Sequence, residues 1–183
     1  GKVAEKLDAV LTAEGCEKAA EFVNFCDAFG IPVLTLTNVK GYEATLASEK
    51  AIAKAAAKLT YAFANATVPK VNVVIGKALG TAYVVMNSKA IGADITMAWP
   101  DAQIGAMDGK LAAKIMYDGQ GADVINEKAA EYEALTLNVT SAAKRGYVDQ
   151  IVNVADTRKY VIGAFEMLFT KSEDRPAKKH GTV

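Results

Sequence analysis

Short apolar runs alternate with longer stretches of helical periodicity along this chain, and this alternation constrains its fold more than any other feature. Residues 31–37 and 71–76 are short, β-branched and apolar, which predicts two buried strands. The Ala-rich stretch over 46–64 lies between them and predicts a closely packed helix. Apolar residues recur close to every 3.6 positions over 15–29, and Gly30 follows as a helix stop. Strands and helices that alternate in this way indicate the α/β class.

The same alternation continues to the carboxyl end. The further elements that we expect, in chain order, are a turn over 38–41, a short helix beginning near Gly80, strands over 93–98 and 103–106, a helix over 109–117, a long amphipathic helix over 125–145, an extended piece over 147–152 and a last helix over 156–171. The sequence contains no internal repeat and no obvious linker. Because 183 residues is the size of one domain, we expect residues 1–183 to form a single domain.

The charges and the two cysteines limit the classes of protein to which the chain can belong. The 21 basic residues balance the 21 acidic residues, which argues against a nucleic-acid partner. No signal peptide is visible, and no apolar run is long enough to span a bilayer. Cys16 and Cys26 fall on one predicted helix, roughly 15 Å apart along its axis. Since a disulfide needs Cα atoms within ~7 Å, the pair cannot bridge, and a reducing, cytoplasmic location is expected.

Side chains that usually carry catalysis are scarce in this sequence. His180 is the only histidine and lies near the end of a charged tail, where a solvated side chain is expected. One histidine and two separated cysteines exclude a His–Cys metal site, so no metal is expected. Asp101 and Asp108 lie near a turn and a helix start and are interpreted as caps. No nucleophile elbow, phosphate loop or dinucleotide fingerprint occurs, so an enzymatic role would rest on backbone groups.

One segment suits backbone chemistry, because residues 77–83 follow a predicted strand and enter a predicted helix. The first amides of a helix have no internal partner, and two of them aimed at a forming oxyanion stabilise an enolate. Gly80 permits close approach of a ligand, and the small Ala82 keeps the opening clear. Further candidates for phosphate or pocket contacts are Lys77, Tyr42 and Tyr83. The segment also fits an ordinary strand, tight turn and helix packed with small side chains, and spacing alone favours that simpler interpretation.

Several longer segments resemble one family, the carboxyltransferase subunits of biotin-dependent acyl-CoA carboxylases and the related decarboxylases. Residues 18–32 resemble the family string KAARFVRFCDAFNIP, and residues 62–71 resemble AFAEATVPKV. Residues 80–89 resemble GGAYDVMSSK, residues 98–108 resemble AWPTAEIAVMG, and residues 142–149 resemble AAxRGxVD. The segments follow the family's order and extend over nearly the whole chain.

The resemblance implies a crotonase-like α/β fold, in which stacked β-sheets are flanked by helices. It also implies carboxyl transfer between biotin on a separate carrier protein and a coenzyme A thioester, with this chain as the second of two related halves. The site then lies where the chain meets the first half in a partner chain, within a homo- or hetero-oligomer. In the family, two consecutive amides of GGAY form an oxyanion hole for the enolate form of biotin. The matching amides belong to Thr81 and Ala82. The matching binding positions are Gly80, Gly41, Tyr42, Tyr83 and Val84.

Several residues depart from the family pattern. The DVPGF element becomes residues 37–42, without its Asp and Pro, and residues 51–58 lack the family's Arg and His. Thr81 replaces the second Gly of GGAY, and Val84 replaces the Asp that follows its Tyr. These changes keep two other interpretations open. One is a non-catalytic assembly subunit of such a complex, and the other is a stand-alone crotonase-like hydratase or isomerase, although no convincing paired carboxylates support the latter.

Overall fold

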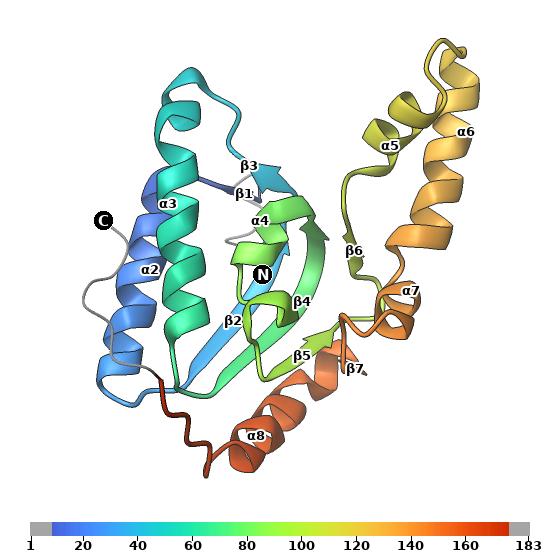
Figure 1. The fold of residues 1–183 in the computed structure, drawn as a ribbon. Coiled ribbons are helices and arrows are strands. Elements are labelled where there is room, and N and C mark those ends of the chain that lie inside the picture. Colours follow the sequence, from blue (N-terminus) through green and yellow to red (C-terminus); the bar gives the residue numbers. More distant parts are fainter. Residues whose placement is uncertain (1–8, 176–183) are drawn as a thin grey trace.

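The computed structural model describes residues 9–175, which form an α/β fold (Figure 1). The strands are β1 (Val10–Leu11), β2 (Val33–Val39), β3 (Gly41–Tyr42), β4 (Lys70–Leu79), β5 (Ile95–Ala98), β6 (Gln103–Gly105) and β7 (Gln150–Ile151). The α-helices are α2 (Ala13–Ala28), α3 (Leu46–Asn65), α4 (Gly80–Val85), α5 (Gly109–Met116), α6 (Ala122–Tyr132), α7 (Val139–Lys144) and α8 (Thr157–Met167). Three shorter helical turns are η1 (Lys89–Ile91), η2 (Glu133–Leu137) and η3 (Val154–Asp156).

Parallel strands form the main sheet, and β4 is its centre. The order is β2–β4–β5–β7, and β6 pairs with the last residues of β4. The β-branched residues Val71, Val73 and Val74 of β4 are fully buried, as a central strand covered on both faces requires. β1 and β3 form a separate two-stranded parallel sheet. The predicted α/β class and the alternation of elements are therefore confirmed.

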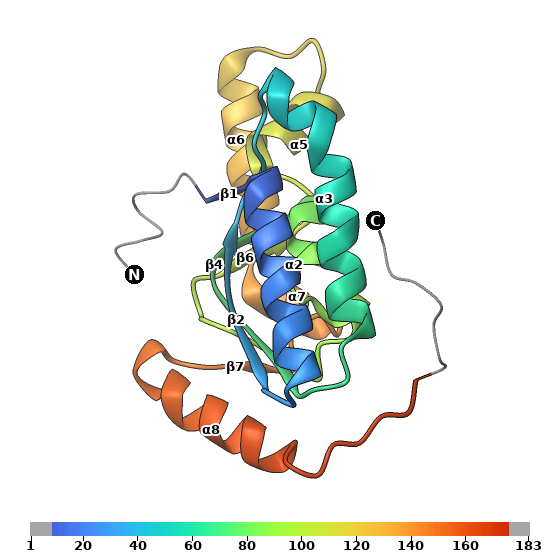
Figure 2. The ribbon, with the colours of Figure 1, turned by 90° about the vertical axis from the view of Figure 1, so that its left-hand side faces the viewer.

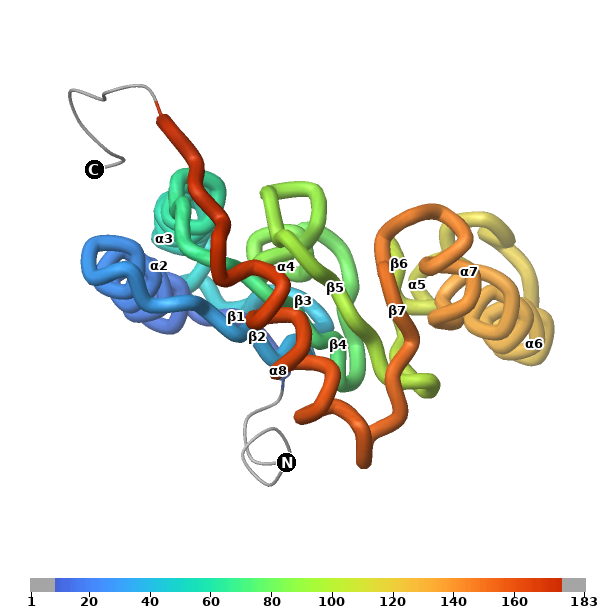
Figure 3. The backbone as a smooth tube through the Cα atoms, turned by 90° about the horizontal axis from the view of Figure 1, so that it is seen from below, coloured from blue at the N-terminus to red at the C-terminus, as the bar shows by residue number. Residues whose placement is uncertain are grey.

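Helices cover both faces of the main sheet (Figures 2 and 3). α2 and α3 lie on one face, where Cys16 and Leu59 pack with Val33 of β2 in a buried apolar cluster. α8 crosses the opposite face, where Ala164 packs with Val71. A third cluster, which includes Ala82 of α4, lies towards the carboxyl ends of the strands. α5 and α6 pack against each other and project from the rest of the fold (Figure 1).

The prediction of one long helix over 125–145 is wrong. The structure divides this stretch into α6, the π-helical turn η2 and α7. Asn138 is extended, and its side-chain oxygen accepts a hydrogen bond from the Ser141 N–H at 2.8 Å. Asparagine is a strong helix N-cap, so it begins a new helix where the periodicity alone predicts a continuous one.

The turn predicted over 38–41 is also wrong, because β2 continues to Val39 and β3 follows almost directly. β4 extends past Gly76 to Leu79, further than the predicted strand. Asn38 explains both extensions, since its Oδ1 accepts a hydrogen bond from the Lys77 N–H at 2.9 Å and so joins β2 to β4. The register between these strands shifts at this point, and a Cβ on Gly76 would lie 2.6 Å from Asn38 Oδ1. The last helix ends at Met167, four residues earlier than predicted.

Both cysteines lie on α2 and are buried and free, as their spacing predicts. Within residues 9–175, no helix has the length and apolar character needed to cross a bilayer. The same residues contain no group of three or more His, Cys, Asp or Glu side chains arranged to hold a metal ion. The predicted solvated residue His180 lies outside the described residues.

Candidate functional site

The junction between β4 and α4 has the geometry that the sequence predicts for a backbone site. Leu79 ends the strand in an extended conformation, with φ −117° and ψ 138°, and Gly80 turns the chain with φ +63°. A side chain at Gly80 would be strained at this φ, and its Cβ would lie 3.2 Å from the Ala106 carbonyl oxygen. α4 therefore begins at a position that favours glycine. The first amides of the helix have no hydrogen-bond partner within it.

A cavity of about 510 Å³ opens beside this junction. Its walls come from α4, η1, β6 and the connection between α7 and β7. The lining residues are Gly80, Thr81, Tyr83, Val84, Ser88, Lys89, Ala90, Ile104, Gly105, Ala106, Arg145 and Tyr147. Ligands of open α/β sheets bind beyond the carboxyl ends of the strands, and Gly80, the residue after β4, lies in this wall. The cavity combines backbone amides, an apolar surface and cationic groups within one hollow.

Four of the seven site residues expected from the sequence line this cavity, namely Gly80, Thr81, Tyr83 and Val84. Ala82 does not line the cavity, because its side chain packs in the core and the residue is 1% exposed. Gly41 and Tyr42 form β3, outside the cavity wall. Burial raises the pKa of Tyr42, while a hydrogen bond with the Thr81 side chain opposes this rise. Tyr42 thus contacts the site indirectly, through the residue that replaces the family's second glycine.

The Tyr83 hydroxyl stays protonated over the ordinary pH range. Burial raises the pKa of Tyr83 to about 12, and the nearby Tyr147 contributes to the rise. A protonated phenol donates a hydrogen bond and cannot act as a base near neutral pH. Tyr83 is therefore suited to contact a ligand and not to remove a proton from it.

Two cationic residues of the cavity were not singled out as site residues from the sequence. Lys89 forms an ion pair with Asp149, whose other carboxylate oxygen accepts a hydrogen bond from the Thr96 N–H at 2.9 Å. Arg145 has no carboxylate partner within residues 9–175. Arg145 and Tyr147 occur in a segment that resembles the family, but only the fold brings them to α4. An unpaired guanidinium in a hollow is suited to an anionic group such as a carboxylate.

The other candidates from the sequence, Asp108, Lys77 and Asp101, lie outside the cavity wall. Asp108 caps α5 by accepting a hydrogen bond from the Lys110 N–H at 3.0 Å, as predicted. Lys77 lies 4.0 Å from this carboxylate in an exposed ion pair. Asp101 lies in the turn between β5 and β6 and is exposed.

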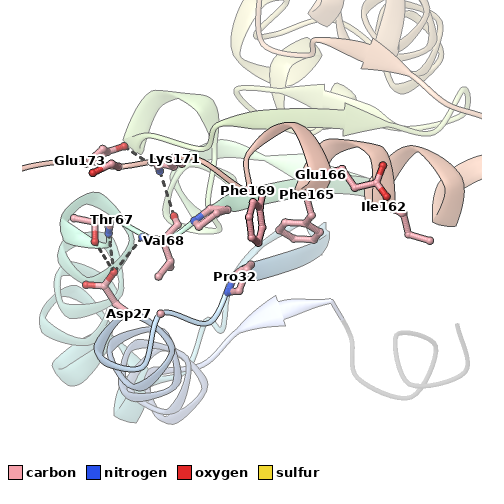
Figure 4. Close-up of a pocket in the computed structure, with 13 residues that line it drawn as sticks. Asp27, Pro32, Thr67, Val68, Ile162, Phe165, Glu166, Phe169, Lys171 and Glu173 are labelled. Atoms are coloured by element: carbon pink, nitrogen blue, oxygen red, sulfur yellow. Dashed lines mark hydrogen bonds and ion pairs between the residues drawn. The ribbon is translucent and has the colours of Figure 1, made fainter.

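A larger hollow of about 880 Å³ lies at the other end of β4, between the start of β2 and the end of α8 (Figure 4). Three of its charged side chains, those of Asp27, Lys171 and Glu173, are already used to hold the chain together. The Asp27 carboxylate accepts hydrogen bonds from the N–H groups of Thr67 and Val68, at 2.7 and 3.2 Å. Lys171 forms ion pairs with Asp94 and Glu173, each at 2.9 Å. The smaller cavity is the candidate site, because it lies at the start of α4 and contains Arg145, which has no carboxylate partner among the described residues.

Comparison with known proteins gives one family for the whole chain. The Carboxyl transferase domain family matches residues 3–183. A putative propionyl-CoA carboxylase beta chain of Bacillus subtilis is 46% identical over 97% of this chain and 36% of its own length. The methylmalonyl-CoA carboxyltransferase 12S subunit of Propionibacterium freudenreichii is 41% identical over 96% of this chain and 35% of its own length. The chain therefore spans about a third of the curated relatives that it matches.

Solved structures agree with this assignment. A transcarboxylase 12S crystal structure with methylmalonyl-coenzyme A and methylmalonic acid bound has a TM-score of 0.90 and 42% identity. The alignment covers 94% of this chain and 34% of the transcarboxylase chain. The beta subunit of a geranyl-CoA carboxylase from P. aeruginosa, at 24% identity and a TM-score of 0.80, supports the fold alone. The chain belongs to the carboxyl transferase domain family and has its crotonase-like α/β fold.

Proposed function

We propose that this domain transfers a carboxyl group between biotin, carried on a separate protein, and an acyl-CoA. One observation carries the proposal: the β4–α4 junction, with Gly80 at φ +63°, opens into a cavity of about 510 Å³ in a domain of this family. The cavity combines donors for an oxyanion, apolar walls that suit a small fused ring, and a guanidinium that suits a carboxylate.

The amides of Thr81 and Ala82 are proposed to donate hydrogen bonds to the ureido oxygen of biotin. Bound biotin would supply the carboxyl group from its ring nitrogen, and negative charge would develop on its ureido oxygen as that group leaves. Two aligned donors stabilise charge on that oxygen, and the removal of one such donor typically costs 10²–10³ in kcat. Gly80 lets the ring approach the backbone, while Tyr83 and Val84 border it. The biotin ring would also supply the base for the α-proton of the thioester.

Partner proteins are proposed to bind the acyl-CoA and to carry the biotin. The curated relatives are about three times longer than this chain, and we propose that a further half of the carboxyltransferase binds the acyl-CoA. That half belongs to a partner chain in a homo- or hetero-oligomer, and a biotin carrier protein completes the complex. Residues 1–183 are proposed as a single carboxyl-terminal carboxyltransferase domain. The free cysteines of α2 support a reducing, cytoplasmic location.

Decarboxylation of malonyl-CoA and methylmalonyl-CoA by the natively purified complex, with and without free biotin, tests the proposal. Biotin-dependent turnover is expected, and the ratio of the two rates gives the acyl preference. Thr81→Pro removes one donor at a helix start that tolerates proline, and a loss of about 10² in kcat is expected. A folded Thr81→Pro complex with the kcat of the parent would contradict the assignment of the oxyanion hole.

An assembly role without catalysis is the second candidate. The Thr81 side chain favours it, because it occupies the position where the family has a glycine and forms a hydrogen bond with Tyr42. No turnover by a complex shown to contain an acyl-CoA-binding partner would support this role.

A further inference from the structure

A row of polar side chains crosses the main sheet beneath α4. Thr35 of β2, Asn72 of β4 and Thr96 of β5 are register partners, so their side chains lie on one face, side by side. Asn72 and Thr96 are 0% exposed and Thr35 is 9% exposed. The face on which they lie is the one covered by α2 and α3, and apolar clusters lie on both sides of the row. A polar row in this position requires hydrogen-bond partners, because buried polar groups without partners are costly.

Part of this requirement is met by hydrogen bonds that join the row to the carboxyl end of α4. Thr37 Oγ1 donates to Asn72 Oδ1 at 2.7 Å and lies 3.5 Å from the carbonyl oxygen of Met86. The Asn87 amide group donates to Thr35 Oγ1 at 2.8 Å. Asn87 follows Met86, the C-cap of α4, and has φ +55°, a left-handed conformation that asparagine tolerates better than most residues. The sheet therefore holds the chain at the point where α4 ends.

Three atoms of the same group have no hydrogen-bond partner among the described residues, namely Asn72 Nδ2, Asn87 Oδ1 and Thr96 Oγ1. The positions of their neighbours direct them to one place. Asn72 uses its oxygen for Thr37, and Asn87 uses its amide group for Thr35, the register partner of Asn72. Neighbouring strands are about 4.8 Å apart, so the side chains of Asn72 and Thr96 are neighbours on this face, and Asn87 joins the same row through Thr35.

We propose that Asn72, Asn87 and Thr96 bind one buried water molecule beneath α4, and that this hydrated group of side chains positions the helix. A water molecule accepts from Asn72 Nδ2, donates to Asn87 Oδ1 and bonds the Thr96 hydroxyl. It thereby makes the three hydrogen bonds that are typical of buried waters. A metal ion does not fit, because Asn72 Nδ2 is a donor and the three residues are neutral.

The hydrated group of Asn72, Asn87 and Thr96 acts on the candidate site through α4. This part of the inference rests on the proposed function. Asn87 is anchored at the carboxyl end of a helix of only six residues, and the Thr81 and Ala82 amides lie at its other end. A shift of the anchor therefore moves the donors as a unit. Since a misplacement of about 1 Å can cost 10²-fold in rate, Asn72 and Asn87 are positioning residues for the oxyanion donors.

The sign of one change in melting temperature tests the water site. Thr96→Val replaces the hydroxyl with a methyl group of the same shape in the natively purified protein. If Thr96 Oγ1 bonds a water, the variant melts about 2 to 4 °C lower, because the water and the two asparagines lose a partner. If the hydroxyl has no partner, its removal leaves the melting temperature unchanged or raises it, which would overturn the water site.

Thr60→Val is the matched control. Its hydroxyl donates to the Ala56 carbonyl of its own helix at 2.8 Å, so little change in melting temperature is expected. A crystal structure of the native protein gives a second measurement that does not depend on a variant. A peak within about 3.2 Å of all three atoms is expected, and an empty or apolar contact there would refute the site.

Kinetics of Asn87→Gly test the positioning role, because glycine removes the side chain and still permits the positive φ. A loss of about tenfold or more in kcat is expected, with the KM for acyl-CoA within about twofold. Asn153→Gly changes an exposed residue next to α8 and is expected to leave both constants unchanged. An unchanged kcat in Asn87→Gly would refute the positioning role. An inactive parent protein would instead refute the proposed function, while the melting and crystallographic results still decide the water site.

Discussion

Gly80→Ala is the substitution whose effect the structure predicts most directly. An L-residue at φ +63° costs about 1 to 2 kcal/mol, and the new Cβ would lie 3.2 Å from the Ala106 carbonyl oxygen, closer than an ordinary contact. We expect a loss of about 1 to 2 kcal/mol in unfolding free energy and a melting temperature about 2 to 8 °C lower. Relief of the contact moves α4 away from β6. A fall in kcat of about tenfold or more is therefore also expected.

Gly30→Ala is the control that separates the effect of backbone strain from the effect of a change at the β4–α4 junction. Gly30 has nearly the same φ, +66°, and a Cβ there would meet no atom within 4 Å. It lies after α2, near the other end of the sheet. The two variants are compared by urea unfolding and by decarboxylation of malonyl-CoA with the native complex. Similar losses of stability are expected, but only Gly80→Ala should lose activity. Equal activity in the two variants would refute the view that the β4–α4 junction forms the site.

Three further predictions concern titration and charge. The Tyr83 pKa is 10.0 in the unfolded chain and about 12 in the fold, so the stability due to the protonated phenol is complete below pH 10 and is lost as pH rises through 12. Alkaline unfolding curves should show that the parent loses about 2 to 3 kcal/mol more than Tyr83→Phe over this range. Burial, followed by Lys171, lowers the pKa of Lys70 from 10.5, so the unfolded chain binds the extra proton and stability rises with pH towards 10.5. In urea unfolding as pH rises towards 10.5, the parent should gain stability relative to Lys70→Met, and parallel curves would contradict the burial of this charge. Arg145→Gln should raise the KM for the carboxylated substrate about tenfold without a change in melting temperature, whereas the exposed Arg158→Gln should leave KM unchanged.

The main strands and helices follow from local properties of the sequence. The β-branched runs become β2 and β4, the Ala-rich stretch becomes α3, and the Gly80 turn opens α4. Periodicity fails where one side chain competes with the regular backbone pattern. Asn138 interrupts a helix by capping the next one, and Asn38 prolongs two strands by bonding across them. Such choices depend on partners that lie far away along the chain, so local spacing cannot predict them.

The candidate site divides in the same way. Gly80 and Thr81 are found from the sequence because a strand, a glycine and small residues occur together. Arg145 is more than 60 positions away and lies in this cavity only because α7 packs beside β6. The polar row beneath α4 is harder still to predict, because Asn72 and Thr96 occur singly on different strands. In the sequence each is an isolated polar residue in an apolar run, and only the register of the sheet shows that they are neighbours.

The projecting pair of helices, α5 and α6, has exposed apolar side chains. Leu111, Ile115 and Met116 of α5 are each more than half exposed. α5 packs against α6, whose own apolar residue Val124 is 37% exposed. Exposed apolar groups on one projecting element indicate an interaction surface, because apolar surface is unfavourable in water and its burial against another protein is favourable. α5 follows β6 directly, and β6 forms one wall of the cavity beside α4. A partner that covers α5 would therefore lie next to the opening of the cavity, in a position to supply the acyl-CoA half of the proposed reaction.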